Sequence, residues 1–248
     1  MKTTGNTILV TGGGTGIGEA LAHRFHDLGN TVIIAGRRLD SLQRAIAGRP
    51  RMHALPLDIE NAANIADFAR QVAAAHPSLN VVINNAGVMR FEQLDRARDL
   101  SDAEATITTN LLGPIRLIDA LVEHLSRQRD AAIVNVSSGL AFVPLIASPT
   151  YSATKAALHS YTISLREALK GKVEVIEIVP PAVQTDLTPG QATRPGYLPL
   201  AEFADEALAL FQQQPTPAEI LVQRVAFLRF AERESRFDAT VTALNHHA

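Results

Sequence analysis

Two kinds of apolar pattern alternate along this chain. Short runs rich in apolar and β-branched residues cover positions 7–10, 31–35, 52–56, 80–83, 131–136, 173–179 and 220–222. Longer segments, in which apolar side chains recur every three or four positions, include 62–75, 102–128 and 152–169. The first pattern predicts strands and the second predicts amphipathic helices. Their alternation predicts an α/β fold with a mainly parallel seven-stranded sheet and helices on both faces.

We expect residues 1–248 to form a single domain. Hydrophobic residues make up 46% of the chain, which is enough for a substantial core. Proline and glycine gather between positions 180 and 199, and this composition predicts a long loop. Because long loops in compact domains are often lids, we expect residues 186–200 to form a substrate loop. A surface insertion without a role is the alternative.

Composition narrows the possible partners. The formal net charge of -2 gives no reason to expect nucleic acid or an anionic membrane as a partner. The absence of cysteine excludes disulfides and thiolate metal sites, and the eight histidines form no recognisable ligand set. The N-terminal residues have no apolar signal-peptide core, and no apolar run has the length of a membrane span. We therefore expect a cytoplasmic protein without a metal site.

A glycine-rich segment follows the first predicted strand. It reads Thr11-Gly12-Gly13-Gly14-Thr15-Gly16-Ile17-Gly18 and leads into an amphipathic stretch, so the local prediction is strand, tight turn and helix. Such a turn can approach a pyrophosphate closely and offer it backbone N–H groups at the positive end of the helix. The interpretation is a Rossmann-type, doubly wound dinucleotide-binding fold. A glycine-rich turn with no ligand is the alternative.

Tyr151 and Lys155 form the most informative pair in the chain. Side chains four residues apart share one face of a helix. A lysine ammonium in that position favours the charged form of a tyrosine and lowers its pKa. A tyrosine with a lowered pKa can exchange a proton with an alkoxide near neutral pH. The same spacing also occurs by chance in many helices.

Five sequence elements, taken together, resemble the short-chain dehydrogenase/reductase family. They are Thr11-Gly12-x-x-x-Gly16-Ile17-Gly18, Asn84-Asn85-Ala86-Gly87, Asn110, Ser138 and Tyr151-x-x-x-Lys155. The resemblance covers about residues 5–190, and the tail around residues 219–229 is similar to the DltE-type branch. It implies an NAD(P)-dependent oxidoreductase that acts on CH–OH or carbonyl groups. Family members pair two long helices across a two-fold axis, which implies a homodimer or homotetramer.

The resemblance assigns roles to four catalytic residues. Tyr151 exchanges the proton, Lys155 holds the nicotinamide ribose, and Ser138 polarises the substrate oxygen. Ser137 is the competing serine, although its distance in sequence from Tyr151 does not match the family. Asn110 distorts a long helix and holds a water in a proton relay to Lys155. An asparagine that makes a local bond to backbone is the alternative for Asn110.

The resemblance also implies a set of cofactor-binding residues. They are Gly12, Gly14, Thr15, Gly16, Ile17, Gly18, Asp58, Ile59, Asn85, Ala86, Gly87, Tyr151, Lys155, Val183 and Thr185. Asp58 would contact the adenine, although a turn or helix-capping acid is an equally good interpretation. Pro181 departs from the family pattern, because proline stands where glycine is usual and it lacks an N–H.

Cofactor preference is argued from the end of the second predicted strand. Arg37 and Arg38 stand there and no acid does. Guanidinium groups bind phosphate through charge-assisted hydrogen bonds, so this pair predicts NADP(H). Thr15 tempers the prediction, because many NADP-preferring relatives have a basic residue there. A solvated cap on the strand is the alternative.

The resulting hypothesis is hydride transfer between NADP(H) and an apolar carbonyl or alcohol substrate. The apolar segment 140–147, together with Leu187, Pro189, Tyr197 and Leu198, is expected to line the substrate pocket. A non-catalytic NADP(H)-binding redox sensor and an NADP-dependent epimerase are the alternatives. The intact set of Asn110, Ser138, Tyr151 and Lys155 argues against the sensor, which needs no proton chemistry.

Overall fold

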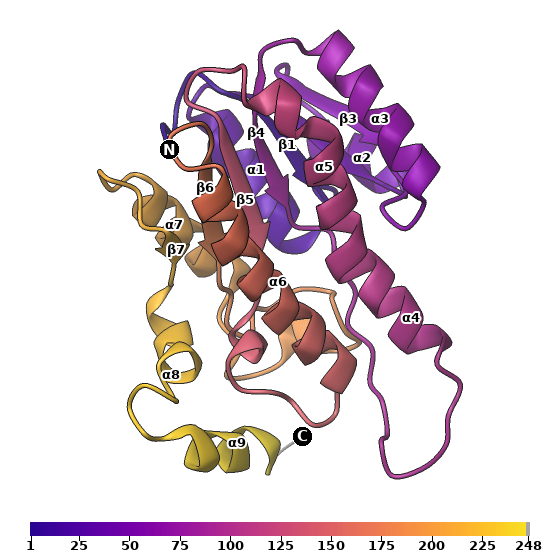
Figure 1. Ribbon diagram of the computed structural model, residues 1–248, viewed down its shortest axis with the longest axis vertical. Coiled ribbons are helices and arrows are strands. Elements are labelled where there is room, and N and C mark those ends of the chain that lie inside the picture. The colour runs from indigo at the N-terminus through magenta and orange to yellow at the C-terminus, as the bar shows by residue number, and fades with distance from the viewer. Residues whose placement is uncertain (247–248) are drawn as a thin grey trace.

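The computed structural model describes residues 1–246 and contains a seven-stranded sheet (Figure 1). In spatial order its strands are β3 (Met52–Pro56), β2 (Thr31–Gly36), β1 (Thr7–Thr11), β4 (Leu79–Asn84), β5 (Ala132–Val136), β6 (Glu174–Ile178) and β7 (Glu219–Ile220). Neighbouring strands all pair in parallel. The strand order reverses between β1 and β4, which is the switch point of a doubly wound sheet. The predicted Rossmann-type α/β fold is confirmed.

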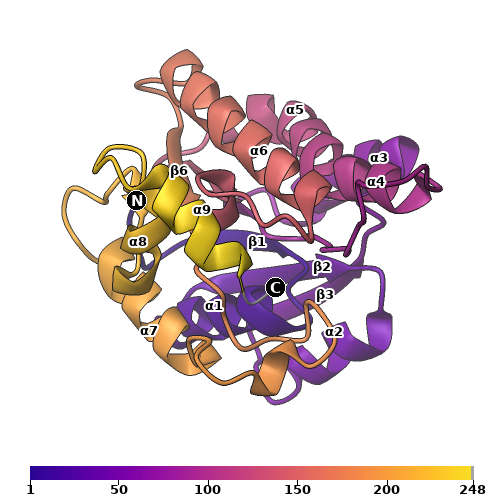
Figure 2. The same cartoon turned by 90° about the horizontal axis from the view of Figure 1, so that it is seen from below.

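Helices cover both faces of the sheet. They are α1 (Gly16–Asp27), α2 (Leu39–Ile46), α3 (Ala62–Ala75), α4 (Ser101–Ile107), α5 (Gly113–Leu125), α6 (Pro149–Ala168), α7 (Leu200–Phe211), α8 (Ala226–Arg229) and α9 (Phe237–Asn245). Seen from below, α3, α5 and α6 lie on one side of the strands, while α1, α2 and α7 lie on the other (Figure 2). None of the helices within residues 1–246 is long and apolar enough to cross a membrane.

The core consists of two apolar layers, one on each face of the sheet. Successive side chains of a strand point to opposite faces, so β1 contributes Ile8 and Val10 to one layer and Leu9 to the other. The first layer includes Phe25 of α1 and the second includes Leu117 of α5, and all of these side chains are fully buried. Such burial on both faces explains why the strands read as continuous apolar runs.

The single helix predicted over residues 102–128 is wrong in detail. The structure contains α4, then a π-helical turn η1 (Thr108–Leu112), and then α5. Pro114 stands in the first turn of α5 and has no N–H to donate to the carbonyl of Asn110, four residues earlier. A proline at this position therefore favours a local widening of the helix. The widened turn contains Asn110, in agreement with the distortion that the family resemblance implied.

The loop predicted at residues 186–200 ends where α7 begins, and it contains the short helix η3 (Gln191–Thr193). Leu198 donates to the carbonyl of Ala182, while its own carbonyl accepts from the N–H of Gln184, both at 2.9 Å. The buried Gln191 amide donates to the carbonyl of Val183 at 2.8 Å. These bonds attach the loop to the segment that follows β6.

The C-terminal segment lies at the end of the molecule where helix α6 starts (Figure 1). The strand predicted at 220–222 is shorter than expected, because β7 ends at Ile220 and the 3-10 helix η4 (Gln223–Val225) follows soon after. Helix α8 and helix α9 complete the segment (Figure 1). Asn245 of α9 accepts from the N–H of Ile146 at 2.7 Å and donates to the carbonyl of Pro144 at 3.2 Å. The C-terminal helix is therefore fastened to the segment that precedes α6.

Candidate active site

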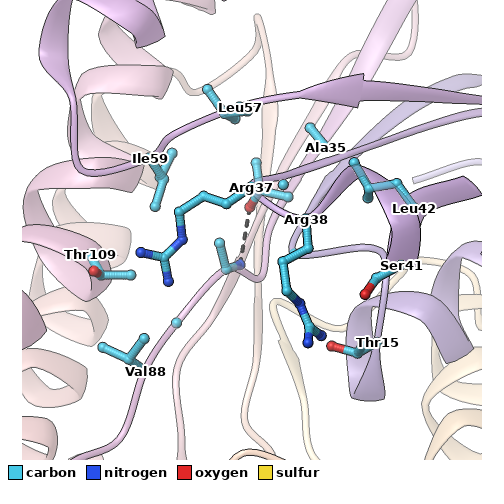
Figure 3. A pocket seen from close by; sticks show the side chains of 16 residues that line it. Thr15, Ala35, Arg37, Arg38, Ser41, Leu42, Leu57, Ile59, Val88 and Thr109 are labelled. Carbon is cyan, nitrogen blue, oxygen red and sulfur yellow. Dashed lines mark hydrogen bonds between the residues drawn. The ribbon is translucent and has the colours of Figure 1, made fainter.

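A cleft opens at the carboxyl ends of β1, β4 and β5, beside the switch point of the sheet. Its volume is about 560 Å³. It is lined by the glycine turn, the strand ends, the first turns of α6 and the segment after β6. A second cavity of about 200 Å³ adjoins it between the glycine turn and β2 (Figure 3). Both cavities share Gly12, Thr15, Arg37, Arg38, Ala86, Gly87 and Val88. Together they form one elongated site, as a dinucleotide requires.

The glycine turn packs against the residues that follow β4. Gly12 has a φ of 66°, and a Cβ there would lie 2.9 Å from the Cα of Ala86. The Thr11 hydroxyl accepts from the N–H groups of Asn85 and Ala86 at 3.0 and 3.1 Å. The Asn85 amide in turn donates to the Thr11 carbonyl at 3.0 Å. Asn85 and Ala86 therefore brace the turn, and both also line the cleft.

Helix α1 begins at the cleft with the family's glycine spacing. Thr15 is its N-cap, and Gly16 and Ile17 follow as lining residues. Gly14 lines the adjoining cavity. Gly18 does not line either cavity, because it faces the brace: a Cβ there would lie 2.4 Å from the Asn85 amide nitrogen. Gly18 thus acts through packing, which allows α1 to start close to Asn85.

The two arginines after β2 point in different directions. Arg37 extends toward Ile59 and Thr109, whereas Arg38 extends toward Ser41 and Thr15 (Figure 3). The Arg37 guanidinium donates to Glu60 at 3.1 Å, and the same carboxylate oxygen accepts from the Thr109 hydroxyl at 2.8 Å. Arg38 faces the space that is also lined by two hydroxyl side chains. Arg37 is therefore held by the acid Glu60, whereas Arg38 is directed at the cleft.

Asp58 and Ile59 lie after β3 but differ in their contacts. Ile59 lines the adjoining cavity together with Leu57, whereas Asp58 is absent from the lining of both cavities. The Asp58 carboxylate accepts from the N–H of Glu60 at 3.1 Å, and Asn61, not Asp58, caps helix α3. The geometry supports the interpretation of Asp58 as a turn residue.

Ser138 and Tyr151 meet inside the cleft. Ser138 lies two residues after β5, as the N-cap of the 3-10 turn Gly139–Ala141, and Tyr151 lies in the first turn of α6. Their side chains lie close enough for Ser138 to act on the pKa of Tyr151, and both residues are buried. Ser137 differs, because its hydroxyl donates to the carbonyl of Ile178 at 3.3 Å and is thus engaged with β6. The structure therefore brings Ser138, not Ser137, to the tyrosine hydroxyl.

Lys155 lies one helical turn after Tyr151. Its ammonium donates to the carbonyl of Val136 at 2.8 Å and lies 5.5 Å from the centroid of the Tyr151 ring. Only 4% of the residue is exposed. Burial lowers the pKa of Lys155 to about 8, although the charge of Glu177 opposes this shift.

The expected lowering of the tyrosine pKa by Lys155 is wrong for the protein alone. Burial raises the pKa of Tyr151 to about 12, and the nearby Ser138 side chain opposes the rise only in part. Desolvation disfavours the phenolate of Tyr151 more than Ser138 favours it. The structure thus places a neutral tyrosine beside a lysine whose ammonium has been made more acidic.

Asn110 contacts the cleft through the segment after β4. Its side-chain oxygen accepts from the N–H of Val88 and its amide donates to the carbonyl of the same residue, both at 2.8 Å. A Cβ added to Gly87 would lie 3.2 Å from the Asn110 oxygen and 3.7 Å from the Lys155 nitrogen. Asn110, Gly87 and Lys155 therefore meet at one point. Asn110 thus bonds to the backbone of Val88, which follows β4 and is distant in sequence. The alternative, a hydrogen bond to the local helix backbone, is wrong.

The segment after β6 closes the other side of the cleft. Val183, Thr185 and Pro181 line it. The Thr185 side chain lies against the glycine turn, since a Cβ on Gly16 would be 3.5 Å from it. The Thr185 hydroxyl accepts from the Gln191 amide at 3.2 Å. Pro181 therefore still lines the cleft, while the Thr185 hydroxyl is bound by Gln191 of the loop.

Comparisons with known proteins agree with this arrangement. Residues 6–195 match the protein family described as short chain dehydrogenase. The chain belongs to this family. It is 38% identical over 237 residues to the uncharacterized oxidoreductase DltE of Bacillus subtilis (strain 168), and the alignment covers 94% of each protein. The family and its DltE-like branch, both inferred from sequence, are confirmed, and the protein is a dehydrogenase/reductase enzyme.

Solved structures of other short-chain dehydrogenases have the same architecture. One from Burkholderia cenocepacia, in complex with NADP, has a TM-score of 0.85 at 26% identity and aligns over 98% of this chain and 99% of its own. Another from Burkholderia phymatum, in complex with NAD, has a TM-score of 0.82 at 21% identity over 96% of both chains. The second likeness shows the fold alone. Nicotinamide cofactors are thus the class that this fold binds.

The substrate side of this short-chain dehydrogenase differs from the sequence expectation. Residues 140–147 are absent from the cleft lining. Gly139–Ala141 form a 3-10 turn, after which Val143 is fully buried and Ile146 is 64% exposed beside α9. Leu198 packs into the core, and Tyr197 stacks with Arg194 at 5.2 Å. A reversal of the chain after β5 carries this apolar run away from the cleft.

Sequence reasoning also missed several residues of the site. Val88, Met89, Arg90, Asp186 and Leu187 line the cleft, although only Leu187 had been expected there. They belong to loops after β4 and β6 and follow no periodic pattern. Glu177, whose charge acts on Lys155, was also missed. Its only signal was an acid inside a strand whose neighbours are Ile176 and Ile178.

Proposed function

We propose that this enzyme transfers a hydride between NADP(H) and a carbonyl or alcohol carbon of a small, apolar or weakly polar compound. The meeting of Ser138 and Tyr151 carries the proposal, because both residues line one cleft together with Lys155 and the glycine turn. Two hydroxyl groups that converge at one point can both address a single substrate oxygen. We further propose that residues 1–248 form one catalytic domain.

The residues of the elongated site fit a dinucleotide. The glycine turn and the start of α1 suit a pyrophosphate, and the adjoining cavity between Leu57, Ile59 and Val88 suits an adenine. Arg38, with Ser41 and Thr15 beside it (Figure 3), would hold a 2′-phosphate through charge-assisted bonds. Arg37 adds positive charge at the rim. The NADP complex of the Burkholderia cenocepacia relative supports the same choice.

The chemical step follows from the buried residues. A bound nicotinamide supplies or accepts the hydride and, when oxidised, contributes a positive charge that favours the phenolate of Tyr151. In the reductive direction, the carbonyl carbon receives the hydride, and the carbonyl π electrons pass to the oxygen. Tyr151 transfers its proton to that oxygen, and Ser138 stabilises the developing charge by a hydrogen bond. Lys155 would hold the nicotinamide ribose, and Asn110 would hold a water that returns a proton toward Lys155.

The lining of the cleft supports an uncharged substrate. Val88, Met89 and Leu187 are apolar members of this lining, while its charged members Arg90 and Asp186 are exposed. Charges of both signs at the rim offer no concentrated field for a polyanion. We propose that the loop 186–200 closes over the cofactor and completes the pocket. Apolar ketones and aldehydes should react faster than dicarboxylates or sugar phosphates.

The experiment is a turnover assay with NADPH and NADH against a panel of carbonyl compounds, beside measurements of cofactor binding without substrate. Turnover with NADPH supports the proposal. Tight NADPH binding without turnover on any compound would favour the redox sensor. Epimerisation without net oxidation of NADPH would favour the epimerase. A phosphorylated sugar as the best substrate would contradict the proposed substrate class.

We also propose that the enzyme is a cytoplasmic homodimer or homotetramer. Two apolar side chains of η1 and α6 are partly exposed: Leu112 is 36% exposed and Ile163 is 45% exposed. The small residue Ala153 of α6 is also exposed. Small and apolar side chains on neighbouring helices suit a close helix pairing across a two-fold axis. Light scattering at micromolar concentration should give at least a dimeric mass. A monomeric mass would contradict this proposal.

A further inference from the structure

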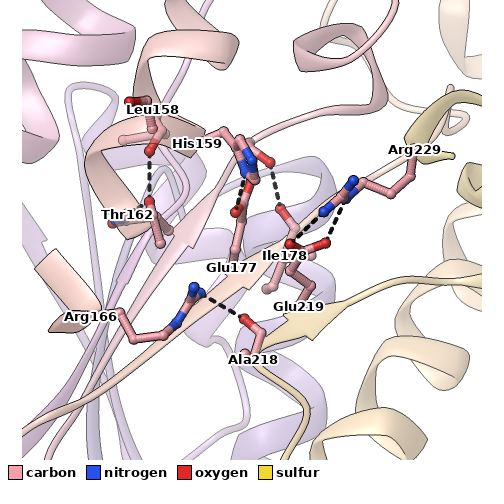
Figure 4. Close-up of polar contacts among 12 residues, drawn as sticks. Leu158, His159, Thr162, Arg166, Glu177, Ile178, Ala218, Glu219 and Arg229 are labelled. Carbon is pink, nitrogen blue, oxygen red and sulfur yellow. Dashed lines mark hydrogen bonds and ion pairs between the residues drawn. The ribbon is translucent and has the colours of Figure 1, made fainter. Parts of the chain in front are cut away.

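Helix α6 carries a third functional side chain in line with Tyr151 and Lys155. His159 follows Lys155 by four residues, so the three side chains recur along one face of the helix. A ring nitrogen of His159 lies 2.7 Å from a carboxylate oxygen of Glu177 on β6 (Figure 4). Glu177 is fully buried. The line of polar groups that begins at the cleft therefore continues to a buried acid.

Beyond Glu177 lies a second, separate ion pair. Arg229 of α8 donates to both carboxylate oxygens of Glu219 on β7, at 2.6 and 2.9 Å (Figure 4). Ligand atoms of His159, Glu177 and Glu219 all lie within 4.8 Å of one another, a spacing that a metal ion could bridge. However, the bidentate contact with Arg229 already compensates the charge of Glu219. We interpret the cluster as an ion-pair network and not as a metal centre.

Glu177 differs from Glu219 because its own charge is only partly compensated. One of its oxygens contacts His159, while the other has no hydrogen-bond partner among residues 1–246. Lys155 is anchored next to Glu177, because its ammonium donates to the carbonyl of Val136 on β5, and Glu177 on β6 pairs with Asn135, the residue before Val136. The charge of Glu177 accordingly raises the pKa of Lys155 and that of Arg229. Arg229 is already paired. The field of a buried carboxylate that is only partly compensated is weakly screened, and Lys155 is the cation that gains from it.

We propose that Glu177, held by His159, is a positioning residue for Lys155: its buried charge keeps the lysine in the ammonium form that holds the nicotinamide ribose. The inference rests on the proposed function for the role of Lys155 itself. The other titratable groups on this helix face and in the ion-pair network are Tyr151 and His159 on α6, Glu219 on β7 and Arg229 on α8. Tyr151 is neutral and Glu219 is paired, so Glu177 is the acid that supports the ammonium.

The decisive test measures the titration of Lys155 directly. The chain has four lysines, namely Lys2, Lys155, Lys170 and Lys172, and the first and last two are exposed. The ¹³Cε resonances of protein labelled at lysine can therefore be assigned with one Lys155→Met variant. Lys155 should titrate near pH 8 in the wild type. In Glu177→Gln its midpoint should fall by about one pH unit, because an opposite charge is removed.

Two further variants keep the test informative if Glu177→Gln folds poorly. His159→Gln removes the imidazole that fixes the position of the Glu177 carboxylate, so it should move the Lys155 midpoint away from its wild-type value. Glu219→Gln is the matched control: it removes a carboxylate from the same cluster, but one that Arg229 already compensates, and should leave the midpoint unchanged. Circular dichroism and melting temperature establish that each variant is folded. An unchanged Lys155 midpoint in both Glu177→Gln and His159→Gln would overturn the inference.

The activity measurement separates this inference from the proposed function. In Glu177→Gln, the alkaline limb of the kcat/KM profile for NADPH-dependent reduction should move to lower pH by about the same amount as the resonance. A merely structural role would lower activity equally at all pH values. If no substrate is turned over but the Lys155 resonance shifts, the proposed function fails and the electrostatic role stands. If turnover occurs and neither the resonance nor the limb moves, only the role of Glu177 fails.

Discussion

The two halves of the cleft are held in place by different means. The nucleotide half is shaped mainly by the backbone, because Gly12 adopts a φ of 66° and Asn85 hydrogen-bonds to the glycine turn. The Arg37 side chain at its rim is 56% exposed. In the chemical half, Tyr151 and Lys155 are buried, and burial raises the pKa of Tyr151 to about 12 and lowers the pKa of Lys155 to about 8. Charges in water can be changed at small cost, whereas buried polar groups cannot. Substitutions in the buried chemical half should therefore have larger effects on activity than substitutions in the exposed nucleotide half.

The largest effect is expected at Tyr151. Tyr151→Phe removes the proton donor but retains the ring, so cofactor affinity should be kept and kcat should fall by roughly several hundredfold or more. Steady-state kinetics beside fluorescence titration with NADPH provides both readouts. Ser137→Ala is a suitable control, because its hydroxyl is engaged with β6. Turnover near the wild-type rate in Tyr151→Phe would refute the acid–base assignment.

The next largest effect distinguishes the two arginines. Arg38→Ala should lower the kcat/KM preference for NADPH over NADH by about 1.5–3 kcal/mol, which is the usual value of a hydrogen bond to a charged group. Arg37→Ala should narrow the same preference less, because Glu60 already accepts from its guanidinium. If Arg37→Ala causes the larger loss, its side chain must leave Glu60 to bind the phosphate. A wild-type preference for NADH would show that both arginines only cap the strand.

The same contrast explains which parts of the molecule could be predicted from the sequence. The strands, the glycine turn and the helical position of Tyr151 and Lys155 depend on local patterns of apolar residues and on spacing along one helix. The π-helical turn around Asn110 could have been suspected from Pro114, four residues later. The different directions of Arg37 and Arg38 could not, because Arg37 is held by Glu60, which is distant in sequence and lies after β3.

The substrate side was hardest to predict. An apolar run such as residues 140–147 has the same composition whether it lines a pocket or packs inside the protein. Its place was decided by long-range partners: Phe142 lies 4.4 Å from Arg229 of α8, and Ile146 is bonded to Asn245 of α9. The sign of the Tyr151 pKa shift was missed for a related reason. Helical spacing reveals a nearby lysine, but the degree of burial is a property of the whole fold.

A smaller effect tests the burial of Lys155 through stability. The pKa of Lys155 in the folded protein, about 8, is below its ordinary value of 10.5. Between these values the unfolded chain binds more protons, so stability rises with pH. From pH 8 to 9.5 the free energy of unfolding of the wild type should increase relative to Lys155→Met by about 1–2 kcal/mol. Urea denaturation at several pH values measures this difference. A difference that stays constant with pH would contradict the burial of a charged lysine.

The smallest effect is expected at Asp58, where the nucleotide half offers two interpretations. If Asp58 is a turn residue, Asp58→Asn retains an oxygen that can accept from the N–H of Glu60, so the free energy of unfolding should change by less than about 0.5 kcal/mol. The affinity for NADPH should also stay close to the wild-type value, since Asp58 does not line the cavity that suits an adenine. Calorimetric titration with NADPH and thermal denaturation together measure both quantities. A tenfold or greater loss of affinity, about 1.4 kcal/mol, with unchanged stability would show that the carboxylate reaches the adenine, and that a side chain at the exposed end of the cleft moves when the cofactor binds.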